Sequence, residues 1–281
     1  MIILKANEIQ FYFARLHIIG IITSKYDYLQ NTFKKGKIYT KRNCEWGFFN
    51  INELENENLK IIFGQLVKFK EEKDEDIVDT VNRKLSKTMI ENRVIATSIF
   101  FIHPDSGIVA YHPIEGKIGY KQFIEIFPQL IIYNNDNMFI EADMDFINSE
   151  ISISEAIESF DKIFTLIISL KPSNPSSRSI WKRTDDKLHN MEAEYYKQIY
   201  KSKKGLILKP NGEPYGDIIM ASDGYGRATL KGIKNNEEFI VSTDRMPMTA
   251  KTLEDKNPLI MFNNIKGKFY EVLKRIKNDK D

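Results

Sequence analysis

Residues 93–111, RVIATSIFFIHPDSGIVAY, decide the fold that the sequence predicts. Two apolar, β-branched runs at 93–102 and 107–111 flank the four residues HPDS at 103–106. Pro, Asp and Ser between apolar runs are typical of a tight turn, because each favours a turn conformation or accepts local hydrogen bonds. We therefore predict two neighbouring strands joined by this turn.

The flanking segments extend these strands into an α+β domain. Alternating polar and apolar residues at the end of 61–70 predict a strand, and residues 138–146 alternate in the same way. Apolar residues recur at helical spacing over 77–85 and 120–127, which predicts two helices. The resulting order over about 59–150, β-α-β-β-α-β, is the ferredoxin-like arrangement.

Additional antiparallel strands and helices are expected outside this core. Residues 11–22 and 44–51 predict strands, joined by an exposed, lysine-rich loop from 24 to 42 that contains at most one short helix. The second half predicts a helix at 153–160, a buried strand at 163–170, a helix that carries Leu188, Met191, Tyr195 and Ile199 on one face and ends at Gly205, strands at 216–221, 227–232 and 239–243, and a last helix from Pro258. We expect an α+β half at 1–150 and a second at 151–281, either separate from the first or continuous with it.

Composition limits the classes of function. The chain has 281 residues with a net charge of +2, which excludes a protein that binds nucleic acid through bulk charge alone. Residues 1–150 contain 18 basic and 21 acidic side chains and residues 151–281 contain 23 and 18, so a basic surface is expected in the second half. One cysteine and the lack of a long apolar run predict a cytoplasmic protein without membrane contact.

One candidate catalytic pattern consists of Asp105 followed by Glu115-Gly116-Lys117. Metal-dependent nucleases of the restriction type combine such an aspartate with a (D/E)-x-K unit, whose carboxylates hold Mg²⁺ and whose lysine acts on the attacking water. The alternative is an ordinary turn, since only nine residues separate Asp105 from Glu115. We expect Mg²⁺ as a cofactor if the nuclease hypothesis holds, and otherwise no cofactor.

A candidate metal site consists of Glu141, Asp143 and Asp145. These acidic residues alternate with Ala142, Met144 and Phe146, so on a strand they share one face at about 6.5–7 Å intervals. The alternative is a solvent-exposed face of an edge strand, where charge prevents pairing with other chains.

A candidate phosphate or nucleic-acid site lies in the loop after the strand at 163–170. Hydroxyl groups, cations and one aromatic side chain occur close together there, at Lys171, Ser173, Asn174, Arg178, Trp181, Lys182 and Arg183. Trp181 is expected to stack on a base, and Arg227 follows a second glycine-rich turn. An ordinary strand-to-helix loop is the alternative.

Three segments carry a resemblance to other proteins. FFIHPDSGIVAYH at 100–112, LKPSNPSS at 170–177 and ASDGYGRATLKG at 221–232 resemble segments of uncharacterised bacterial proteins found among phage-defence genes. The resemblance implies a bacterial anti-phage defence component. We expect a non-enzymatic subunit that binds RNA or DNA. The alternatives are the Mg²⁺-dependent nuclease, and a scaffold subunit that binds a protein partner of a multi-component system.

Overall fold

The chain forms two compact units in a computed structural model, and the fold is mixed α+β with antiparallel sheets. Unit 1 comprises residues 1–17, 106–110 and 144–281, and unit 2 comprises residues 18–105 and 111–143. The structure describes residues 7–20, 22–56, 59–70, 73–81, 83–90, 93–135, 140–173 and 178–277. The N-terminal strand therefore belongs to the unit that contains the C-terminal half.

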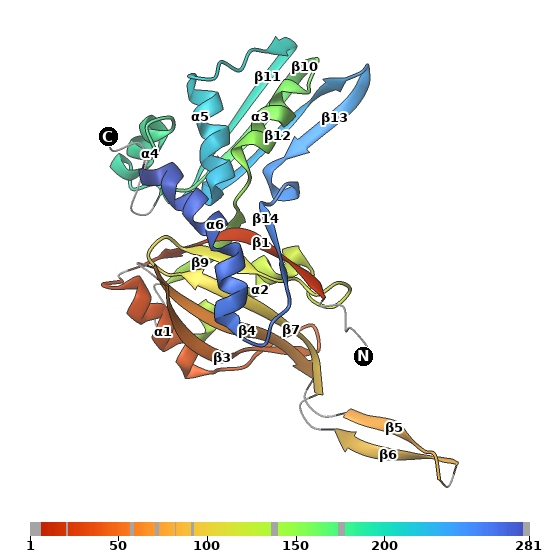
Figure 1. Ribbon diagram of the computed structural model, residues 1–281. Helices are drawn as coiled ribbons and strands as arrows, with labels where there is room; N and C mark the ends of the chain where they lie inside the picture. Colours follow the sequence, from red (N-terminus) through yellow and green to blue (C-terminus); the bar gives the residue numbers. More distant parts are fainter. Residues whose placement is uncertain are drawn as a thin grey trace. The chain divides into compact units, whose positions relative to one another are not determined.

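Two sheets build unit 1 (Figure 1). In the first, β1 (Glu8–Ile19) lies between β14 (Thr249–Leu253) and β8 (Ile108–Tyr111), and β9 (Glu141–Phe146) also pairs with β1. Helix α6 (Pro258–Lys277) begins where the Asn257 side chain accepts a hydrogen bond from the Leu259 N–H at 3.0 Å. Its Phe269 packs edge-on against Phe13 of β1, so the helix covers this sheet.

The second sheet of unit 1 is antiparallel, in the order β11 (Tyr196–Leu206), β10 (Lys162–Leu170), β12 (Gly226–Lys234) and β13 (Glu237–Ser242). The remaining elements of this unit are α3 (Glu150–Glu158), α4 (Lys182–Asn190), α5 (Glu213–Met220), the π-helix η1 (Ala221–Tyr225) and the 3-10 helix η2 (Thr243–Arg245). Leu166, Ile168 and Leu170 of β10 form one buried core with apolar residues of α3, α4 and α5. The three helices therefore cover one face of the sheet.

Unit 2 contains a four-stranded antiparallel order, β7 (Arg93–His103), β4 (Leu59–Lys70), β3 (Cys44–Asn56) and β2 (Tyr39–Lys41). Helices α1 (Lys25–Lys35) and α2 (Tyr120–Asn134) contribute to an aromatic core in which Phe33, Phe48, Phe100 and Phe127 contact one another. Strands β5 (Lys73–Asp79) and β6 (Lys84–Ile90) pair only with each other among the described strands.

The β5–β6 hairpin corrects the prediction of a helix at 77–85. Val78 lies opposite Leu85 in the hairpin, and the two side chains are 68% and 71% exposed. The spacing that suggested a helix face therefore arises from two strands folded back on each other. Without this helix, the order over 59–150 is not β-α-β-β-α-β. The prediction of a ferredoxin-like order was therefore wrong, and the prediction of the α+β class is confirmed.

In the second half of the chain, two predicted elements were wrong and five are confirmed. Residues 216–221 lie in α5 and η1 instead of a strand, because a short apolar run fits a buried helix as well as a buried strand. The helix expected through Ile199 ends at Asn190, and residues 196–206 form β11. The helices at 153–160 and from Pro258 and the strands at 163–170, 227–232 and 239–243 are confirmed as α3, α6, β10, β12 and β13.

No helix in the described part of the chain is both long and apolar enough to cross a membrane.

Candidate functional site

The uncovered face of the second sheet of unit 1 carries the main candidate site. Along β10, Leu166, Ile168 and Leu170 face the helices, whereas Thr165, Ile167 and Ser169 alternate with them and are only half-buried. Successive side chains of a strand point to opposite faces, so these three residues mark the face that the helices do not cover.

Four cationic side chains are arranged in two rows on this face. Ser169 lies between Lys197 of β11 and Arg227 of β12, and four residues away Thr165 lies between Lys201 and Lys231. Strands are about 4.8 Å apart and rise about 3.3 Å per residue, so the cations stand at the corners of a rectangle of about 10 by 13 Å. All four residues are exposed. We call Lys197, Lys201, Arg227 and Lys231 the cation rectangle.

The centre of the cation rectangle is uncharged. The middle row consists of Ile199, Ile167 and Thr229. Glu238 is the nearest acidic residue in the strand register, on β13 opposite Ile233, beyond the Lys231 corner. The face therefore presents four cations around a floor of uncharged side chains.

The sequence of β11 explains how this face arises. In YKQIYK at 196–201, Tyr196 and Tyr200 pack against the helix-covered core, and Lys197 and Lys201 alternate with them. The phenol rings anchor an edge strand, and the lysines on the other face keep their charge in water. This period-two pattern is the signal that reading the segment as a helix missed.

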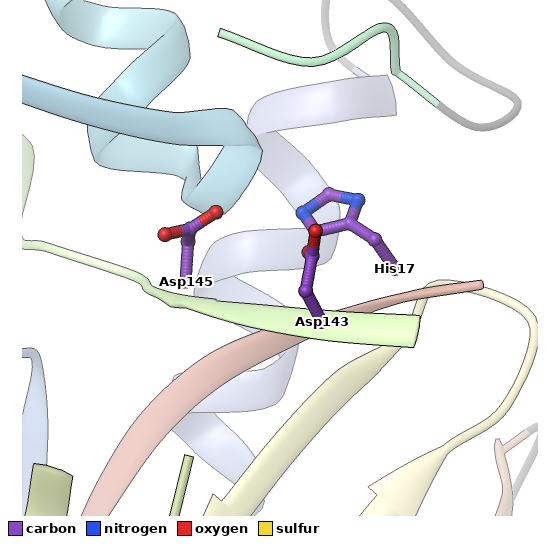
Figure 2. A group of neighbouring side chains, drawn as sticks. All are labelled: His17, Asp143 and Asp145. Carbon is purple, nitrogen blue, oxygen red and sulfur yellow. The ribbon is translucent and has the colours of Figure 1, made fainter. Parts of the chain in front are cut away.

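A second candidate site is the group His17, Asp143 and Asp145 on the paired strands β1 and β9. Each side chain offers one potential ligand atom, and these atoms lie within 4.8 Å of one another. Asp143 immediately precedes unit 1 on the same strand as Asp145, so its place beside Asp145 follows from strand geometry. Figure 2 shows both aspartates on the same side of β9 and the imidazole of His17 above Asp143.

Asp145 is buried and is the most strongly paired member of this group. Its Oδ2 accepts a hydrogen bond from Lys171 Nζ at 2.7 Å, and its Oδ1 accepts one from Arg227 Nε at 3.2 Å. Burial raises the pKa of a carboxyl, but Lys171, His17 and Arg227 outweigh burial here and hold the pKa of Asp145 below its ordinary value. Asp145 is therefore ionised at neutral pH.

His17 is held from the opposite side by the backbone of η1. Its Nε2 lies 2.5 Å from the Gly224 carbonyl oxygen, and because a carbonyl only accepts, Nε2 is the donor. The ring is buried and lies 5.3 Å from that of Tyr225. The imidazole therefore has a defined place beside the two carboxylates.

Arg178 and Trp181 of the predicted phosphate loop are committed to another carboxylate, Asp223. Arg178 Nη1 and Trp181 Nε1 lie 3.0 and 3.1 Å from Asp223 Oδ2, and Arg178 also pairs with Glu150. The Trp181 side chain is 1% exposed. The tryptophan expected to stack on a base is part of the protein core, so stacking would require the core to open.

The rest of the loop is similarly engaged or lies on the helix surface. Ser173 donates to buried Asp185 through both its N–H and its hydroxyl group. Lys182 pairs with Asp186 one helical turn away, and exposed Arg183 lies 3.5 Å from Glu213. Asn174 lies outside the described residues.

The structure does not bring the predicted catalytic residues together. Asp105 is exposed in the turn before β8, and Glu115 and Lys117 are exposed in the tight turn between Ile114 and Ile118, after β8. The aspartate and the E-x-K unit thus lie at opposite ends of a strand. Of the predicted acidic triplet, Glu141 is exposed at the start of β9, and Asp143 and Asp145 join His17, which the sequence did not place there.

Comparison with known families identifies a family for this chain. A family model described as a domain of unknown function, DUF4747, matches residues 9–270. The chain belongs to the DUF4747 family. Comparison with curated proteins finds no match. The matched region of this DUF4747 chain includes His17, Asp143, Asp145 and the whole cation rectangle.

Proposed function

We propose that this protein binds nucleic acid and that the cation rectangle contacts its phosphates. The observation that carries the proposal is the strand register, which places four exposed cations around an uncharged floor on the sheet face opposite α3, α4 and α5. Neutralisation of phosphates by lysine and arginine provides most of the affinity of sequence-independent nucleic-acid binding.

The residues of this surface also indicate the mode of binding. Two rows of cations about 13 Å apart, with the two cations of each row about 10 Å apart, suit an extended strand of phosphates that crosses the sheet. The middle row consists of isoleucine and threonine, without the aromatic rings on which single-stranded bases stack. We therefore expect phosphate contacts to dominate, with strong dependence on salt and little dependence on sequence.

The predicted loop at 171–183 contributes little to this surface. Its buried cations already pair with Asp145, Asp223 and Glu150, and removing them from these carboxylates would leave buried charges without partners. Of the contacts predicted from the sequence, Arg227 alone belongs to the proposed surface, and Lys197, Lys201 and Lys231 complete it.

Fluorescence anisotropy with labelled single-stranded RNA and DNA, between about 50 and 200 mM salt, tests the proposal. The test variant is Lys197→Ala, Lys201→Ala and Lys231→Ala combined. The control, Lys34→Ala, Lys35→Ala and Lys37→Ala, removes the same charge from the lysine-rich connection. We expect the test variant alone to weaken binding and to reduce the slope of log K against log salt by about 2, since each lost contact contributes about 0.7.

The proposal would be overturned by equal affinity of the test variant and the native protein, or by an equal loss in the control. The defence role rests on the resemblance of the three sequence segments. It is tested by comparing phage plaque numbers on cells that carry the native gene or the test variant in its natural gene neighbourhood. We expect protection to fall with the test variant, and equal protection would separate a defence role from nucleic-acid binding.

A further inference from the structure

We propose that His17, Asp143 and Asp145 bind one divalent metal ion at the end of the nucleic-acid-binding face. Arg227 links the two sites, because it forms one corner of the cation rectangle and also contacts Asp145. The metal site itself does not depend on nucleic-acid binding and can be measured without it.

The geometry of the three side chains is close to that of a ligand set. Two ligands on opposite sides of one ion at about 2.0–2.3 Å are at most about 4.6 Å apart. The ligand atoms of His17, Asp143 and Asp145 all lie within 4.8 Å of one another. The difference between 4.8 Å and about 4.6 Å is a few tenths of an ångström, and Asp143, the partly exposed member of the set, is the side chain that we expect to move.

The donor atoms define the class of metal. One imidazole nitrogen and two carboxylates form a mixed nitrogen and oxygen set, which suits first-row divalent ions such as Mn²⁺ better than Mg²⁺, which prefers oxygen ligands and retains its waters. Three protein ligands also leave coordination positions for water or a phosphate oxygen. We therefore choose Mn²⁺ as the probe.

Electrostatics show how an ion enters a site that already contains two cations. The Lys171 side chain is 18% exposed, whereas that of Arg227 is 57% exposed and can extend into solvent. When Arg227 leaves Asp145, the two carboxylates and Lys171 carry a net charge of −1, which attracts a divalent ion. The ion therefore replaces Arg227 at Asp145, and Lys171 stays in place.

This exchange places a positive centre beside the nucleic-acid-binding face. The bound ion, two carboxylates and Lys171 sum to +1, and the displaced Arg227 becomes available for a phosphate. Arg227 and the ion compete for the same carboxylate, Asp145, so we expect Arg227 to balance the charge of Asp145 whenever no ion is bound.

Mn²⁺ binding, followed by electron paramagnetic resonance and calorimetry without nucleic acid, tests the proposal. We expect one Mn²⁺ per chain, with affinity lowered at least about tenfold in Asp143→Asn and in His17→Gln. Asp105→Asn is the matched control, because it removes an exposed aspartate from a turn outside the site. Thermal unfolding of each variant verifies that it is folded.

Three results would overturn the metal site. They are no Mn²⁺ bound by the native protein at about 1 mM, an affinity of Asp143→Asn equal to that of the native protein, or an equal loss in Asp105→Asn. If His17→Gln fails to fold, Asp143→Asn decides, because its side chain is partly exposed and its replacement preserves shape. Mn²⁺ binding without nucleic-acid binding would support the metal site and refute the proposed function. Nucleic-acid binding without Mn²⁺ binding would support the proposed function and refute the metal site.

Discussion

Arg227 and Asp145 form the contact that joins the two candidate sites, with Nε 3.2 Å from Oδ1. The arginine comes from an exposed row of a sheet and the carboxylate is buried, so one partner is free to move and the other is not. Lys171 pairs with the other oxygen of the same carboxylate. The two cations therefore have different roles although they share a partner.

The first prediction concerns this difference. Lys171→Met is expected to lower the free energy of unfolding by about 3 kcal/mol, because it leaves a buried carboxylate with an exposed arginine as its remaining cation. Arg227→Met is expected to lower it by less than about 1 kcal/mol, since the exposed arginine is well solvated without the pair and Lys171 still pairs with Asp145. Urea denaturation at neutral pH measures the free energy of unfolding of both variants. Equal losses of stability would contradict the different roles of Lys171 and Arg227 at Asp145.

The second prediction separates the core from the binding surface. Trp181→Phe removes the hydrogen bond to Asp223 and is expected to lower the free energy of unfolding by about 1–3 kcal/mol. Oligonucleotide affinity is expected to stay unchanged, because Trp181 is buried and lies outside the cation rectangle. A loss of affinity in the folded variant, measured by anisotropy, would restore the original hypothesis of base stacking.

The third prediction concerns Asp217 of α5. Burial raises the pKa of this carboxyl to about 6; hydrogen bonding from Thr184 and the charge of Lys187 act in the opposite direction, and Glu213 adds to the rise. The folded state thus holds the proton more tightly than the unfolded state, whose pKa is about 3.9. The stability that this proton contributes is complete below about pH 4 and is lost as pH rises through 6.

Asp217→Asn removes this pH dependence. The amide stays neutral, and its oxygen can still accept a hydrogen bond from Thr184. The free energy of unfolding of the variant is therefore expected to equal that of the native protein near pH 4 and to exceed it at pH 7 by up to about 3 kcal/mol. Chemical denaturation at both values of pH measures the difference. If the difference in free energy of unfolding between the variant and the native protein is the same at pH 4 and pH 7, Asp217 does not titrate in this range.

The fourth prediction follows from the shared arginine. If metal binding frees Arg227 for phosphate, Mn²⁺ is expected to raise oligonucleotide affinity at least about fivefold, and the oligonucleotide is expected to raise Mn²⁺ affinity by the same factor. Arg227→Ala is expected to weaken both effects while leaving Mn²⁺ binding intact. Titrations of each ligand in the presence and absence of the other measure this coupling, and an enhancement that persists in Arg227→Ala would exclude Arg227 as the link.

Elements with a strong local pattern could be predicted from the sequence. The strand at 163–170 has a continuous apolar run, and the helix from Pro258 has both its cap and its periodicity. The hairpin at 73–90 and the strand at 196–206 were missed because their apolar residues also occur at helical spacing. In the structure, Val78 and Ile199 are 68% and 50% exposed, so neither side chain lies on a helix face buried against a core.

The sequence by itself determined the α+β class, the basic second half and the presence of two aspartates that share one face of a strand. Only the tertiary structure decided which charges are available for a partner. Lys171 and Arg178 are bound to buried carboxylates, whereas Lys197 and Lys231, which come from strands that are not neighbours, reach one exposed face through β10. The physical reason is that strand pairing and burial decide whether a charge is neutralised inside the protein or is left to bind a partner, and both depend on contacts between residues far apart in the chain.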